Sequence, residues 1–289
     1  MQIIYHLGAH CTESERLCRS LLRDRGPLSK AGTVVAGPAR FRHVLREALE
    51  TLGGAPASAE TQAFLLENVM DEDSPDRIIF CNENFLGQPN WALAQNQIYA
   101  RAGEKTSGLR QLFPDAPTAF YLSMRSPATF LQTLISKGNA PKQTGAALLL
   151  DPATLRWSNT VASIREACPD ATVTVWCDED APVIWETVMR DMAGIDDSLE
   201  LAGAFDLVET LINKRGMRSL RQAIAPGMAP ADRHRIIAAH LEKFGQADAL
   251  DMEIDMPDWT QDYIDQLDAI YDADVEAMAR MPGVRVLRP

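Results

Sequence analysis

The apolar residues of this chain form two kinds of pattern, and the two kinds alternate along the sequence. Short apolar and β-branched runs are typical of strands buried on both faces, and they occupy 3–7, 77–81, 118–124 and 171–176. Longer segments carry apolar residues at helical spacing, and they occupy 40–52, 58–69, 104–113, 127–136, 154–167 and 182–192. From 206 onward the pattern indicates only helices until a short last strand at 284–286.

This alternation predicts an α/β fold with a mostly parallel central sheet and helices on both faces. No composition shift marks a domain boundary, so we expect a single domain over 1–289 with a helical C-terminal portion from about 200. In such sheets ligands bind beyond the carboxyl ends of the strands. Three stretches follow strand ends, namely Gly8–Ser14, Asn82–Phe85 and Arg125–Thr133. We therefore expect Gly8–Ser14, Glu83 and Arg125 to converge at one edge of the sheet.

The first of these stretches reads as a strand, a small-residue turn and a helix start. Thr12-x-x-Glu15 matches a capping box, and Gly26 marks the predicted end of the helix. A strand–loop–helix unit of this kind directs backbone N–H groups toward an anion. The alternative is an ordinary turn between a strand and a helix, which these residues taken alone favour.

Composition places the chain among soluble globular proteins. Of its 289 residues 46% are hydrophobic and 24% charged, and no apolar run approaches the length of about 18 residues that spans a membrane. Met1 leads straight into the first strand, without a basic and apolar leader. Five cysteines with no CxxC pair suit a reducing compartment. We therefore expect a cytoplasmic protein without a membrane partner.

The net charge of −12 is unevenly distributed. Eleven acids and no Lys or Arg lie between Asp248 and Glu276, a pattern typical of a solvated helix face. Eight bases lie between Arg16 and Arg46, an excess suited to an anionic ligand. No basic stripe with interleaved aromatic residues is present, which argues against nucleic-acid binding.

The first loop carries a resemblance to a known family. His6, Gly8, His10 and Thr12 match the strand and His-x-Gly-x-His-Lys-Thr-Gly-Thr-Thr loop of bacterial sulfotransferase-like P-loop proteins, which holds the 5′-phosphosulfate of the donor PAPS. The chain departs from that loop in part, and the strict Walker pattern is absent. Cys11 stands in place of Lys, Glu13 in place of Gly and Ser14 in place of Thr. The resemblance implies that PAPS or PAP is bound by Gly8, Ala9, His10, Cys11, Thr12 and Ser14.

These departures change the charge at the loop. A Lys would place a cation on the transferred group, and Cys11 supplies none. Glu13 and Glu15 add negative charge near the helix start, where a carboxylate by itself stabilises the helix. The loop is thus expected to keep the shape of an anion site that its own acids partly fill.

A second segment strengthens the resemblance. Arg125-Ser126-Pro127 with Thr133 eight residues after the Arg is similar to the family segment that binds the 3′-phosphate of PAPS, with Thr at the family's Ser position. Pro127 suits a first helical turn, so Arg125 precedes the helix and its forked guanidinium is available to a phosphate. The alternative is that Arg125 is a salt-bridged residue at a strand end.

Two residues are candidates for acid–base chemistry. Glu83 follows the second strand and is the preferred base for an acceptor hydroxyl, with a helix-cap or surface carboxylate as the alternative. His10 is placed to polarise a donor oxygen or act as a base, with a packed loop histidine as the alternative. His6-x3-His10 spans a strand and a turn and lacks the helical geometry of a zinc motif, so no metal is expected.

Two functions from different classes follow. The first is sulfuryl transfer from PAPS to a hydroxyl or amine of a carbohydrate or small molecule, favoured by Arg125 and Thr133. The second is a catalytically degenerate protein of this fold that binds a ligand or protein partner without turnover, favoured by Cys11 in place of Lys. The oligomeric state and the acceptor are open at this level.

Overall fold

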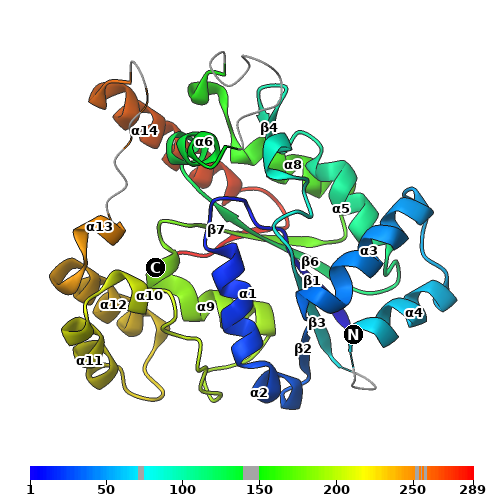
Figure 1. Ribbon diagram of the computed structural model, residues 1–289, viewed down its shortest axis with the longest axis horizontal. Coiled ribbons are helices and arrows are strands. Elements are labelled where there is room, and N and C mark those ends of the chain that lie inside the picture. Colours follow the sequence, from blue (N-terminus) through cyan, green and yellow to red (C-terminus); the bar gives the residue numbers. More distant parts are fainter. Residues whose placement is uncertain (71–74, 139–149, 251–253, 255, 257–258) are drawn as a thin grey trace.

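The computed structural model describes residues 1–70, 75–138, 150–250, 254, 256 and 259–289 (Figure 1). The strands are β1 (Gln2–His6), β2 (Thr33–Val35), β3 (Arg77–Cys81), β4 (Leu93–Ala94), β5 (Gln97–Ile98), β6 (Thr118–Met124), β7 (Thr172–Cys177) and β8 (Val284–Val286). The helices of the first half are α1 (Ser14–Arg23), α2 (Arg25–Lys30), α3 (Pro38–Leu52), α4 (Ala59–Val69), α5 (Ala102–Gln111) and α6 (Pro127–Ser136). Those of the second half are α8 (Trp157–Ala167), α9 (Ala181–Ala193), α10 (Val208–Leu211), α11 (Lys214–Ala223), α12 (Pro230–Phe244), α13 (Ala247–Leu250) and α14 (Gln261–Met278). Two short 3-10 helices cover Pro89–Trp91 and Pro152–Thr154.

The central sheet is all parallel, with six strands in the order β2-β3-β1-β6-β7-β8. The chain leaves β1 toward β2 on one side and later crosses from β3 over to β6 on the other. The loops after β1 and β6 therefore diverge at the point where the strand order reverses, which is where open α/β sheets bind their ligands. The predicted fold class is confirmed.

Successive residues of each strand face opposite sides of the sheet, and each side is covered by helices. On one side Ile3, Tyr5 and Phe80 lie in a core with residues of α3, α4, α5, α6, α8 and α14. On the other side Ile4 and Ile79 lie in a core with residues of α1, α2 and α9. Burial on both faces is the physical reason why these strands lack polar alternation.

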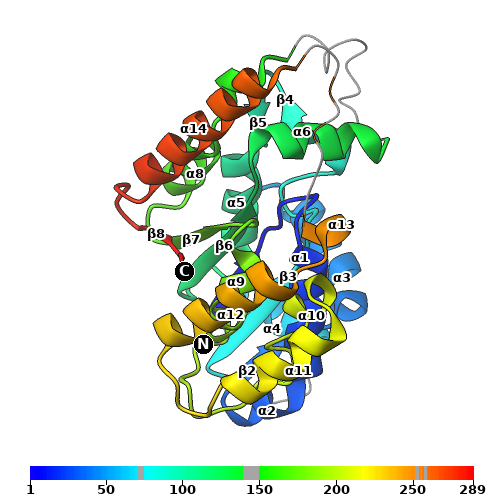
Figure 2. The same cartoon turned by 90° about the vertical axis from the view of Figure 1, so that its left-hand side faces the viewer.

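After residue 200 the described chain is helical until β8, which pairs with β7. Helices α10, α11 and α12 share a smaller apolar cluster of their own, whereas α14 packs against α8 and the sheet (Figure 2). On α14 the acids Asp262, Asp265, Asp268, Asp272 and Glu276 are exposed, as a solvated helix face requires. Asp274 is the exception, because it is buried and accepts a hydrogen bond from Ser158 N–H at 3.1 Å. The acids at 251, 253, 255 and 258 lie outside the described residues.

Several local predictions were wrong. Strand β2 was not predicted, because three residues are too short to carry a periodic pattern and are fixed by pairing with β3. The small hairpin of β4 and β5 was also missed. Gly26 does not end a long helix but lies inside α2, which follows α1 after a single residue, Asp24. Over the described residues no helix is long and apolar enough to cross a membrane.

Candidate functional site

The loop between β1 and α1 continues along β6 before it turns into the helix. Ala9 N–H donates to the Ser123 carbonyl at 3.0 Å, and Ser123 N–H donates to the Gly8 carbonyl at 2.7 Å. Gly8 has a φ of +108°, and a Cβ at this position would lie 3.2 Å from Cα of Glu83. Glycine is required here by both the backbone conformation and the close approach. The same approach places Glu83 directly beside the loop.

The hydroxyl groups of the loop form hydrogen bonds with other atoms of the same loop. Thr12 Oγ1 donates to the Ala9 carbonyl at 2.7 Å and lies 2.6 Å from Ser14 Oγ. Helix α1 begins at Ser14 with Glu13 at the N-cap position and no side-chain cap. The predicted capping box of Thr12 and Glu15 is therefore wrong, because the Thr12 hydroxyl binds a carbonyl three residues earlier.

The acid that reaches the start of α1 comes from a distant strand. Asp178, the residue directly after β7, accepts hydrogen bonds on Oδ1 from Glu13 N–H at 3.0 Å and from the Ser123 hydroxyl at 3.1 Å. A carboxylate at this place satisfies an N–H group that the helix leaves unpaired and interacts favourably with the helix dipole. Burial raises the pKa of Asp178 to about 7. A carboxyl group of the chain itself thus holds the position where an anion would meet the helix.

Sequence reasoning named the wrong acids for this position. The carboxylate of Glu13 pairs with Arg16 at 2.6 Å, and that of Glu15 pairs with Arg19 at 3.3 Å. Asp178 was not singled out as a site residue, although it follows a strand end as Glu83 does. The expectation that ligands bind beyond the ends of the strands, which selected Glu83, applies equally to Asp178.

His10 is held by two partners. Its backbone N–H donates to the Tyr99 hydroxyl at 3.0 Å, and its Nδ1 lies 2.6 Å from the same oxygen. Its Nε2 lies 3.1 Å from Asn84 Oδ1. Because the Tyr99 oxygen accepts from the backbone, its proton is free for Nδ1, which assigns the Nε2–H tautomer that donates to Asn84. Burial lowers the pKa of His10, so the ring is neutral and neither nitrogen is open to a substrate.

Arg125 lies beside the loop, as predicted. Its Nη1 donates to the Cys11 carbonyl at 2.5 Å and its Nε to Thr129 Oγ1 at 3.0 Å. The Arg125 carbonyl accepts from Trp157 Nε1 at 2.7 Å, which fixes the end of β6. Arg125 precedes α6, and Thr133 Oγ1, two turns into that helix, donates to the Thr129 carbonyl at 2.7 Å. Their roles toward a 3′-phosphate stay predictions.

Cys11 contributes its backbone rather than its thiol. The residue has a φ of +62°, and this left-handed conformation belongs to the turn whose carbonyl Arg125 binds. Burial raises the pKa of the Cys11 thiol, which disfavours the reactive thiolate. Position 11 thus presents neither a cation nor a reactive thiolate.

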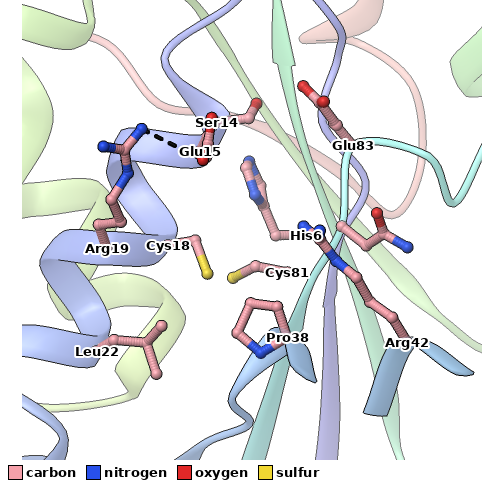
Figure 3. A pocket seen from close by; sticks show the side chains of 11 residues that line it. His6, Ser14, Glu15, Cys18, Arg19, Leu22, Pro38, Arg42, Cys81 and Glu83 are labelled. Atoms are coloured by element: carbon pink, nitrogen blue, oxygen red, sulfur yellow. Dashed lines mark ion pairs between the residues drawn. The ribbon is translucent and has the colours of Figure 1, made fainter. Parts of the chain in front are cut away.

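A cavity of about 290 Å³ opens beside the loop, between α1, the start of α3 and the end of β3 (Figure 3). Glu83 lies on its wall, together with His6 from β1 and Arg42 from α3. The expected convergence of the loop, Glu83 and Arg125 at one sheet edge is confirmed. The chemistry assigned to Glu83 stays a prediction.

The described residues contain no group of three or more His, Cys, Asp or Glu side chains placed to hold a metal ion. Comparison of the chain with protein-family models, curated proteins and solved structures finds no match. A proposal about function therefore draws on the geometry of the loop and the adjoining cavity together with the resemblance of the loop residues.

Proposed function

We propose that this chain is a sulfotransferase-like protein that binds a ligand without transferring a sulfuryl group. The observation that supports this most strongly is the hydrogen bond from Glu13 N–H to the Asp178 carboxyl group. Sulfuryl transfer depends on alignment of the donor and neutralisation of its charge. Two like charges about 4 Å apart near a protein surface repel by roughly 4 kcal/mol. An ionised Asp178 at the helix start therefore opposes a phosphosulfate in that place.

The other groups that would meet a donor are also engaged internally. Position 11 offers a neutral thiol instead of a cation. Arg125 donates to the Cys11 carbonyl, and both ring nitrogens of His10 have partners. Each of these contacts would have to be exchanged for a contact with the donor. The contacts of the loop are therefore those of a stable structural element rather than those of a catalytic loop.

The ligand class to test first comes from the resemblance. Gly8, the loop hydroxyls and Arg125 retain the order of a PAPS site, and Arg125 lies against the loop. We expect PAP to bind weakly at neutral pH, because Asp178 repels it.

The test is a sulfuryl-transfer assay with PAPS and a panel of hydroxyl and amine acceptors, run beside a calorimetric titration with PAP. We expect no sulfated product under conditions in which a known sulfotransferase turns over. Formation of a sulfated product by the wild-type chain would overturn the proposal and establish the active transferase instead.

A variant designed to bind PAP more tightly provides a second test of the loop. Cys11→Lys with Glu13→Gly adds one cation and removes one anion, so PAP should bind more tightly in low salt and less so in high salt. Since Glu13 pairs with Arg16, most of the gain should come from Cys11→Lys alone. Glu15 is left unchanged because it pairs with Arg19. Unchanged PAP affinity in a folded variant would mean that the loop is not a relic phosphate site.

A further inference from the structure

The wall of the cavity beside the loop includes a buried polar atom without a partner among the described residues. His6 is 1% exposed, and its Nε2 makes no hydrogen bond within the described part of the chain. The ring stacks on Trp176, with centroids 5.6 Å apart, so it is fixed in place on the sheet. Buried polar atoms are nearly always hydrogen-bonded, and one without a partner in a cavity wall calls for an explanation.

Two charged groups on the same cavity also lack partners among the residues that the structure describes. Arg42 on α3 and Glu83 after β3 form no hydrogen bond or ion pair with any residue that the structure describes. The other two charged side chains on the wall, Arg19 and Glu15, neutralise each other at 3.3 Å. One cation and one anion therefore remain for a ligand. In the view of Figure 3 the His6 ring lies to the left of both.

The rest of the wall is less polar and limits the size of a ligand. Cys18 and Cys81 point toward each other below the His6 ring in the view of Figure 3, and Leu22 and Pro38 complete this side. A volume of about 290 Å³ lies close to the lower limit of roughly 300 Å³ for small-molecule sites. Ligand sites of this kind combine an apolar wall with a few polar groups that fix orientation.

From these observations we propose that the cavity binds a small zwitterion of amino-acid size, its ammonium group at Glu83, its carboxylate at Arg42 and one hydrogen bond to His6. A simple anion would leave Glu83 unpaired beside it, and a simple cation would leave Arg42 unpaired. Burial lowers the pKa of His6 to about 3, so the ring adds a hydrogen bond and no charge. The inference goes beyond the proposed function, because it requires neither PAPS nor its absence.

The probes differ from one another only in their charged groups and in the length of the carbon chain. Glycine, β-alanine, 4-aminobutyrate and 6-aminohexanoate are titrated into the full chain by calorimetry. Each is compared with the carboxylate and the amine of the same chain length. At least one zwitterion should bind, and both singly charged analogues should bind about tenfold or more weakly, a difference of about 1.4 kcal/mol. Equal binding of an analogue, or binding of no probe, would overturn the proposal.

Substitutions then assign the two ends of the ligand. Arg42→Gln and Glu83→Gln should each weaken the zwitterion about tenfold or more. Arg42→Gln should spare binding of the amine, and Glu83→Gln should spare the carboxylate. Arg46→Gln, an exposed cation one turn further along α3, is the matched control and should have no effect. If all three variants behave alike, the charges act from a distance and the assignment is refuted. Sulfuryl transfer is measured separately, so turnover would refute the proposed function and leave this result standing.

Discussion

Replacement of Asp178 by Asn tests the central feature of the site with little change of shape. Asn keeps an oxygen in the position that accepts from Glu13 N–H and from the Ser123 hydroxyl, and it removes the negative charge. The pKa of Asp178 is raised by burial from an ordinary value of 3.8 to about 7. Between about pH 4 and pH 7 the Asp178 carboxyl group therefore keeps its proton in the native protein, whereas the unfolded chain has already lost it.

The sign of the pH effect follows from proton linkage. Because the native state binds more protons in this range, the free energy of unfolding of the wild type falls as pH rises and reaches its full loss above pH 7. A shift of about 3 pKa units corresponds to about 4 kcal/mol, reduced by the solvent that reaches this partly exposed side chain. We expect Asp178→Asn to be more stable than the wild type by about 2–4 kcal/mol at pH 8. Near pH 4 the two proteins should be equally stable.

The measurement is urea unfolding of both proteins from pH 4 to pH 8.5. His6, whose pKa burial lowers to about 3, has the opposite effect and destabilises the fold on acidification, but it cancels in the difference between the two proteins. Asp272→Asn, an exposed acid on α14, is the control and should follow the wild type. A constant difference between Asp178→Asn and the wild type over the whole range would refute the reasoning.

The same substitution links the stability result to ligand binding. At pH 8 Asp178→Asn should bind PAP more tightly than the wild type, and the wild type should gain PAP affinity as Asp178 is protonated below pH 7. Calorimetry at pH 6 and pH 8 measures both effects. PAP affinities that are equal for the two proteins at pH 8 would show that the carboxylate does not oppose the ligand.

Three further predictions concern neighbouring groups. Arg125→Ala should weaken PAP binding more than Thr133→Ala in calorimetry, because a charged hydrogen bond contributes about 1.5–3 kcal/mol against about 0.5–1.5 for a neutral one; equal small effects would contradict a phosphate role. Tyr99→Phe should lower the free energy of unfolding by about 1–3 kcal/mol, because His10 loses both contacts with that hydroxyl. Urea unfolding measures this, and an unchanged free energy of unfolding would refute it. Gly8→Ala should destabilise the fold by about 1–3 kcal/mol because of its φ and its contact with Glu83. Thermal unfolding measures the effect at Gly8, and an unchanged transition temperature would argue against the strain there.

The sequence by itself determined the elements that rest on local pattern. Runs of apolar residues at 77–81 and 118–124 predicted buried strands, and the parallel sheet followed from their alternation with helices. The helical segment predicted from 58 begins there, and the Ser58 side chain accepts the N-cap hydrogen bond. The position of Arg125 before Pro127 was also readable, because a proline after a strand end fixes where the next helix begins.

Only the tertiary structure decided how the polar groups of the site are used. Asp178 and Glu13 are separated by 165 residues and His10 and Tyr99 by 89, so no spacing rule along the chain could pair them. The Thr12 hydroxyl had two acceptable local partners, and the path of the loop along β6 selected the Ala9 carbonyl over the helix start. A side chain's neighbours across a sheet are set by strand order and register, and these become fixed only when the two apolar faces are buried together.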